Sequence, residues 1–198
     1  MFVSLWHPWT QHGPRRLART ALMVCASIAA HTAAWAATPS PYAGQESRDI
    51  KALSPAEQAD WLAGKGMGLA KAAELNGYPG PAHVLELASD LALTSEQRAR
   101  TQALFETMAA RAQALGRELV EAERALDARF ASKQITQADL AQALERIGAL
   151  QAQVRAAHLE AHLEQVRILS PEQTARYVKL RGYGSGAADH GGRGHHRH

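Results

Sequence analysis

Histidine is the residue type whose spacing in this sequence points most directly to chemistry. His158 and His162 lie four residues apart in a segment with helical periodicity, so both imidazoles share one helix face. Two imidazoles at this spacing can bind a single metal ion. The pair also falls close to the apolar stripe of the same segment, where half-exposed, hydrogen-bonded histidines at the end of a helix seam would explain it too. The sequence leaves both interpretations open.

The C-terminal tail holds a second group of histidines. Residues 184–198 contain almost nothing apolar, so we predict a disordered Gly/His-rich tail. Unfolded ends of this kind bind Zn²⁺, Ni²⁺ or Cu²⁺ through neutral imidazoles, and the alternative is a tail that only adds solubility. The candidate ligands are His190, His195, His196 and His198.

Composition excludes several other kinds of site. The net charge of +3 comes entirely from three arginines among the first 36 residues, so the remainder is charge-balanced. This balance argues against a nucleic-acid partner. The single cysteine, Cys25, lies in the same leader, which excludes a disulfide framework, a cysteine-ligated metal and a cysteine nucleophile from the rest.

The first 36 residues have the three-part layout of a secretory signal. A basic patch precedes an apolar run from Ala21 to Ala30, and small residues end at Ala34-Trp35-Ala36. The run falls well short of the roughly 20 residues that cross a bilayer as a helix. We therefore predict export, cleavage after about Ala36 and no stable membrane insertion.

Helices must position the histidines, because no part of the remaining sequence alternates with period two. Proline and glycine punctuate segments rich in Ala, Leu, Glu, Gln and Arg, which predicts an all-α protein. Three segments begin with a hydroxyl residue followed three positions later by Glu or Gln, the pattern of a helix capping box. These pairs are Ser54 with Glu57, Thr94 with Gln97, and Ser170 with Gln173.

The centre of the chain predicts a long antiparallel hairpin with short flanking helices. Its two helices should run from Ser95 to Ala131 and from Gln137 to Ile168, on the order of 55 and 45 Å. The flanking helices are a region ending at Asn76-Gly77 and a short helix from His83 to Leu91. Facing apolar stripes join the long helices: Leu104, Met108, Ala112, Leu115, Leu119, Ala122, Leu126 and Phe130 with Leu140, Leu144, Ile147 and Val154.

Helices this long exceed what the short ones can cover. A second copy of the chain packed along the hairpin would cover the remainder, so we predict a homodimer. Its contact residues would be Leu159, Leu163 and Val166. The predicted organisation is a signal peptide over 1–36, a loose segment over 37–52, a helical domain over 53–183 and the tail over 184–198.

Two short motifs resemble those of a known family. Leu93, Thr94 and Gln97 form a Leu-Thr-x-x-Gln motif, and its Ser variant consists of Leu169, Ser170 and Gln173. With a signal peptide and a His-rich end, the chain resembles the LTxxQ proteins of the bacterial periplasm. These include the Spy/CpxP chaperone-like proteins, the ZraP group and related periplasmic heavy-metal sensors. The resemblance implies a periplasmic, cradle-like helical dimer.

The resemblance implies two functions. One is an ATP-independent chaperone that needs no cofactor, binds unfolded or misfolded envelope proteins and signals through a membrane sensor kinase or an anti-sigma complex. Arginines on the first long helix could steer its clients, although a solvated charged face explains them as well: Arg98, Arg111, Arg117 and Arg124. The other is a heavy-metal sensor or resistance protein that binds Zn²⁺, Ni²⁺ or Cu²⁺.

For the metal sensor, a third ligand must join His158 and His162. His83 is the best candidate, because its helix leads into the Thr94 cap and the sensors use a histidine just before the first long helix. Met67 and Met108 are expected to fill the core instead of binding metal. The sequence does not indicate an enzyme, since we find no phosphate loop, no Ser/His/Asp arrangement and no convergent carboxylate pair.

Overall fold

The computed structural model describes residues 40–183. The chain divides into two compact units, residues 1–43 and 44–198, and the described part of the first is a single turn. The predicted signal peptide and the four tail histidines lie outside the described residues. The fold of the second unit therefore rests on residues 44–183.

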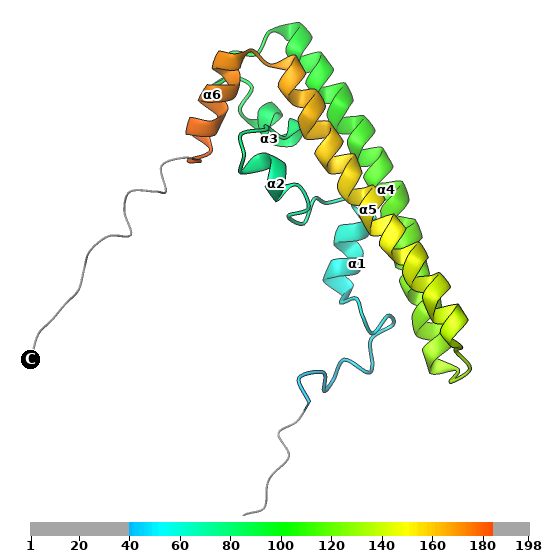
Figure 1. Cartoon of the computed structure of the whole chain (residues 1–198). Coiled ribbons are helices and arrows are strands. Elements are labelled where there is room, and N and C mark those ends of the chain that lie inside the picture. The colour runs from blue at the N-terminus through cyan, green and yellow to red at the C-terminus, as the bar shows by residue number, and fades with distance from the viewer. Residues whose placement is uncertain (1–39, 184–198) are drawn as a thin grey trace, which may run out of the picture. The chain divides into compact units, whose positions relative to one another are not determined.

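Residues 44–183 form helices and turns without a strand, which confirms the all-α class. The helices are α1 (Pro55–Leu62), α2 (Lys71–Glu74), α3 (Pro81–Glu86), α4 (Ser95–Ala131), α5 (Gln137–Ile168) and α6 (Pro171–Leu180). In Figure 1, α4 and α5 run side by side as a long hairpin, and α1, α2 and α3 lie along it. None of the helices within residues 40–183 combines the length and apolar character needed to cross a membrane.

The long hairpin has the predicted bounds because side chains define its helix ends. All three predicted capping boxes are present, and α5 begins with a fourth, formed by Thr136 and Asp139. In each box the hydroxyl accepts a hydrogen bond from an early backbone N–H, while the later side chain accepts one from the cap residue.

The segment before the hairpin differs from the sequence prediction. The first helical region is broken after α1, and α2 is a single turn, because the chain takes positive φ at Gly64, Met67 and Gly68. The short helix containing His83 ends at Glu86, not at Leu91. Turns follow the helix, and in them the N–H of Leu93 donates to the carbonyl of Ala88 at 3.0 Å.

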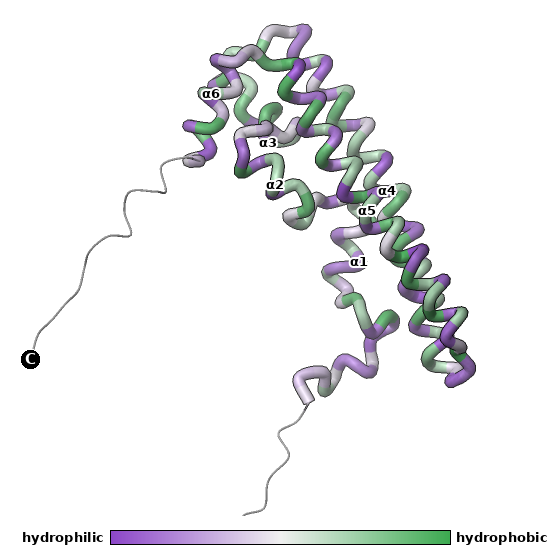
Figure 2. The backbone as a smooth tube through the Cα atoms, viewed as in Figure 1, coloured by the Kyte–Doolittle hydropathy of each residue, from purple (hydrophilic) through white to green (hydrophobic). Residues whose placement is uncertain are grey.

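The apolar stripes are buried in the middle of the hairpin and exposed at its far end, near the turn between α4 and α5. Leu119, Ile147 and Leu150 are buried together in a cluster to which Trp61 of α1 is packed. Phe130 and Leu144, by contrast, are each 53% exposed. The short helices lie along the other half of the hairpin, and apolar positions continue beyond them in Figure 2. The short helices therefore leave Phe130 and Leu144 exposed in the single chain.

A second core cluster lies at the other end of α5. Val84, Leu91, Leu169 and Tyr177 are buried together, and they join α3, the start of α4 and the end of α5 to α6. Tyr177 has no exposed surface and is among the largest fully buried side chains. On α5, His158 and His162 fall between the two clusters, so each side of the histidine pair has a packed core.

Helix α1 approaches α4 unusually closely at Gly116. A Cβ atom built on Gly116 would lie 2.0 Å from the carbonyl oxygen of Trp61. No side chain can occupy that space, so glycine is what allows α1 to pack its backbone directly on α4. This contact holds the start of the loop from Gly64 to Gly68 against the hairpin.

The capping glutamines of α4 and α6 bind one another. The Nε2 of Gln97 donates to the Oε1 of Gln173 at 2.8 Å, and the reverse bond is 3.0 Å. Each amide also donates to a backbone carbonyl, Gln97 to Ile168 and Gln173 to Leu91. The two Leu-Thr-x-x-Gln-type motifs therefore join the start of α4 to the turn between α5 and α6.

Candidate metal-binding pocket

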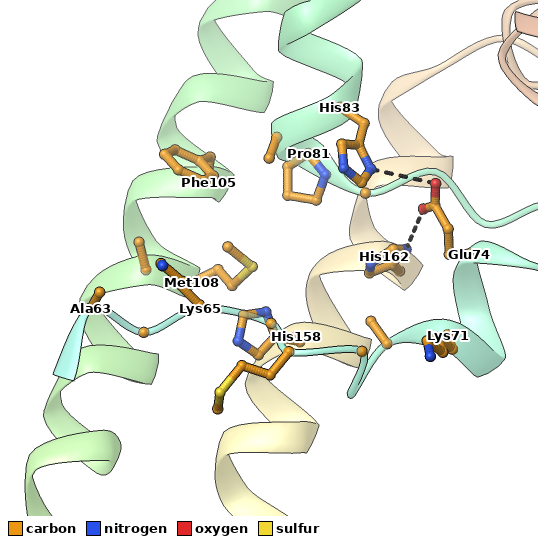
Figure 3. Close-up of a pocket in the computed structure, with 18 of the residues that line it drawn as sticks. Ala63, Lys65, Lys71, Glu74, Pro81, His83, Phe105, Met108, His158 and His162 are labelled. Atoms are coloured by element: carbon orange, nitrogen blue, oxygen red, sulfur yellow. Dashed lines mark ion pairs between the residues drawn. The ribbon is translucent and has the colours of Figure 1, made fainter. Parts of the chain in front are cut away.

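A pocket of about 590 Å³ opens between the hairpin and the segment from α1 to α3. Its walls come from the loop after α1, from α2 and α3, and from one face of each long helix. Figure 3 shows His158, His162, His83 and Glu74 among the side chains that line it. The two histidines of α5 and the candidate third ligand thus share one cavity.

His158 is buried and has an unpartnered nitrogen. It is 6% exposed, and its Nε2 has no hydrogen-bond partner. Burial, reinforced by the neighbouring His162, lowers the pKa of His158, so the ring is neutral at pH 7. The half-exposed, hydrogen-bonded state allowed by the sequence is therefore wrong for His158, and its free lone pair or N–H is the feature to explain.

His162 is equally buried, but one of its nitrogens has a partner. The ring is 7% exposed, and its Nδ1 lies 2.7 Å from the carbonyl oxygen of Tyr78. A carbonyl can only accept, so Nδ1 carries a proton, and Nε2 is the ring nitrogen that this bond leaves available. A Cβ on Gly80 would lie 3.1 Å from this Nε2, so the backbone passes close to it.

Glu74 connects the histidines to α6, and the sequence analysis did not identify it. Its Oε1 accepts hydrogen bonds from the hydroxyls of Tyr177 at 2.6 Å and Tyr183 at 2.9 Å. The same oxygen lies 3.4 Å from the Nδ1 of His83, and Oε2 lies 3.8 Å from the Nδ1 of His162. Oε2 itself is buried without a hydrogen bond.

These contacts decide the charge of Glu74. Burial raises the pKa of a carboxyl group, but the hydrogen bonds from Tyr177 and Tyr183 and the nearby histidines outweigh it and lower the pKa below its ordinary value. Burial and the bond to Glu74 raise the pKa of Tyr177, so its hydroxyl remains a donor. One carboxylate oxygen of Glu74 therefore accepts two hydrogen bonds in the pocket, and the other accepts none.

The donor set fits a metal ion only in part. His158 and His162 offer ring nitrogen atoms at the wall of one cavity, as a ligand pair should. Yet among residues 40–183 no group of three or more His, Cys, Asp or Glu side chains is placed to hold one ion. A bound ion would therefore need donors of another kind or a movement of His83 or Glu74 toward the pair.

One of the two methionines is placed differently from the sequence prediction. Met108 of α4 and Met67 of the loop both line the pocket. Met67 is 40% exposed and has a φ of 43°, in the left-handed region that residues other than glycine rarely adopt. The expectation that Met67 fills the core is therefore wrong, because the glycine-flanked loop places its side chain at the cavity.

The arginines proposed for client binding lie on the surface of α4. Arg111 pairs with Glu160 at 2.5 Å, and Arg124 pairs with Glu121 at 2.6 Å. Arg98 and Arg117 are exposed side chains of the same helix. Their role in client binding stays a prediction.

Comparison with known proteins adds the family. No curated protein and no solved structure matches the chain. The family model described as heavy-metal resistance matches residues 69–176, which is more than half of the chain and includes α2 to α5 and most of α6. Glu74, His83, His158 and His162 all lie within the matched range. The chain belongs to the heavy-metal resistance family.

Proposed function

We propose that this protein is an exported, periplasmic heavy-metal resistance or sensor protein that binds a metal ion in the pocket beside α5. The observation that supports this most is the state of His158 and His162. Both are buried on one helix face, burial lowers the pKa of His158, and the bond from His162 to Tyr78 leaves Nε2 as its available nitrogen. Buried imidazoles normally have their hydrogen bonds satisfied, whereas His158 does not.

The surrounding residues would support the ion without all contacting it. The carbonyl of Tyr78 fixes the ring orientation of His162, the role that outer partners of metal-binding histidines usually have. Glu74 and His83 lie on the opposite, short-helix side of the cavity. An ion bound between the two sides would couple the short helices to the hairpin, and such coupling is how binding can change a conformation.

This proposal is tested by metal titration of three proteins. Calorimetry with Zn²⁺, Ni²⁺ and Cu²⁺ should find a tight site in the whole chain and in a chain truncated after Tyr183. Changing His158 and His162 together to Asn should weaken that site by about 100-fold or more, because loss of an outer partner alone costs 10- to 100-fold. A tight site that survives the double substitution, or that disappears with the tail, would contradict the proposal.

Client binding is a second candidate, favoured by the uncovered apolar end of the hairpin. Phe130 and Leu144 are half exposed there, beyond the reach of the short helices. A chaperone surface of this kind should slow the aggregation of an unfolded protein, and Phe130→Ser with Leu144→Ser should weaken that effect. If the wild-type chain left the light scattering of an aggregating client unchanged, client binding would be contradicted. The same surface is also available to the second copy of the predicted homodimer.

A further inference from the structure

We propose that the pocket beside α5 selects a soft monovalent cation, Cu(I) or Ag(I), through the thioethers of Met67 and Met108 together with His158 and His162. This inference rests on the proposed function, since it names the ion that the same pocket would take. Neither methionine was a ligand candidate from the sequence. The structure places both at the wall of the cavity that holds the histidine pair.

The first argument is the number of available nitrogen and oxygen ligands. Zn²⁺ in a protein normally takes four ligands from Cys, His, Asp and Glu. Within residues 40–183 no three such side chains are grouped around one point. Thioethers are absent from that ligand class but suit Cu(I), which soft sulfur donors select. Two imidazoles and two thioethers together provide four donors, whereas the imidazoles alone provide two.

The second argument is the conformation of the loop that carries Met67. The residue has positive φ although it has a side chain, and it lies between Gly66 and Gly68. Strained residues of this kind persist where the surroundings fix them, and they concentrate at functional sites. Gly66 itself lies against the ring of His158, since a Cβ there would be 3.7 Å from its Nδ1. The loop that carries Met67 thus packs against the unpartnered histidine, and both residues line the same pocket.

The third argument is the position of Met108 and the character of the walls. Met108 extends from α4 into the pocket, opposite α5, and Phe105 lies one turn away on the same helix (Figure 3). Pro81 and Ala109 add apolar surface to the walls, and Lys65, Lys71 and Gln113 add polar side chains. The oxygen of Glu74 that accepts hydrogen bonds is occupied by Tyr177 and Tyr183. Because Met108 lines the cavity from α4 and His158 and His162 line it from α5, sulfur and nitrogen donors border the same space.

The test compares Cu(I) with Zn²⁺ on the same proteins. The background is the full chain in which Cys25, the leader histidines His7, His12 and His31 and the four tail histidines are replaced by serine, so that ligands outside the pocket contribute little. Into it we introduce Met67→Leu with Met108→Leu, substitutions that nearly conserve volume. Phe105→Leu, which changes a pocket wall without removing a donor, is the matched control. Competition with a Cu(I) chelator and with a Zn²⁺ chelator gives the two affinities.

The double methionine variant should bind Cu(I) about 10- to 100-fold more weakly, at least the cost of losing an outer partner of a ligand. Its Zn²⁺ affinity should be unchanged, and Phe105→Leu should change neither. X-ray absorption of the Cu(I)-loaded background protein should show sulfur neighbours at the copper, a result that does not depend on any variant's folding. Only nitrogen or oxygen neighbours would overturn the inference.

The failure of this inference is distinguishable from failure of the proposed function. Cu(I) affinity unchanged by the methionine substitutions, with metal binding still lost in His158→Asn with His162→Asn, would overturn the soft-ion inference alone. Absence of tight binding of either metal would overturn both.

Discussion

Replacing Tyr177 with alanine is expected to lower the free energy of unfolding by about 3–5 kcal/mol, the range for removing a large buried aromatic side chain. Tyr177 is completely buried and packs with Val84, Leu91 and Leu169, so its loss would leave a cavity where α3, α5 and α6 meet. It would also remove the donor nearest to the carboxylate of Glu74. Chemical denaturation followed by circular dichroism measures the change.

The variant Tyr177→Phe separates packing from the hydrogen bond. It keeps the ring and removes only the hydroxyl, so the expected cost is about 1–3 kcal/mol, the penalty for a buried polar group that loses a partner. Glu74 would retain Tyr183 and the weaker contacts of Arg181 and His83. If the alanine variant were no less stable than the phenylalanine variant, the cluster around Tyr177 would not be the core that the structure indicates.

Replacing Gly116 with alanine should detach α1 from the hairpin. The new methyl group would lie 2.0 Å from the carbonyl oxygen of Trp61, which is backbone and cannot rotate away. Overpacking of this kind costs about 1–3 kcal/mol and occasionally more. We expect faster hydrogen exchange in α1 and a red shift in the fluorescence of Trp61, because its side chain would become more exposed to water.

Gly148 supplies the matched control for that experiment. It lies in α5, and a Cβ built on it meets nothing within 4 Å. Gly148→Ala should therefore raise stability by about 0.5–1 kcal/mol, because alanine loses less conformational freedom in a helix interior. Equal effects of the two substitutions would contradict the close approach of α1 and α4.

The hairpin was predictable because its determinants are local. Capping boxes at Thr94 and Thr136 fix the first residues of α4 and α5, and long apolar periodicity specifies the rest of each helix. The spacing of His158 and His162 likewise identifies a shared helix face without reference to other parts of the chain. These predictions required only residues within a few turns of one another.

The remainder of the pocket depends on long-range contacts and could not be read from the sequence. Glu74 sits in an alanine-rich stretch that looks like ordinary exposed helix, and only α6 and the turn after it, about a hundred positions later, supply the tyrosines that bury it. The exposure of Met67 depends on a loop conformation between two glycines. The Gly66-Met67-Gly68 spacing was the available signal, and it predicts a turn without saying which cavity the side chain would line.

The paired glutamines of the two Leu-Thr-x-x-Gln-type motifs explain why an amide stands at both positions. A capping box accepts Glu as readily as Gln, and the box of α1 uses Glu57, while that of α5 uses Asp139. Only Gln97 and Gln173 face each other, and only they must donate as well as accept. A carboxylate at either position would still cap its own helix but would leave the carbonyl of Ile168 or Leu91 without its donor. The glutamine of each motif is thus specified by a tertiary contact, and the motif encodes the meeting of two helix ends instead of the start of one.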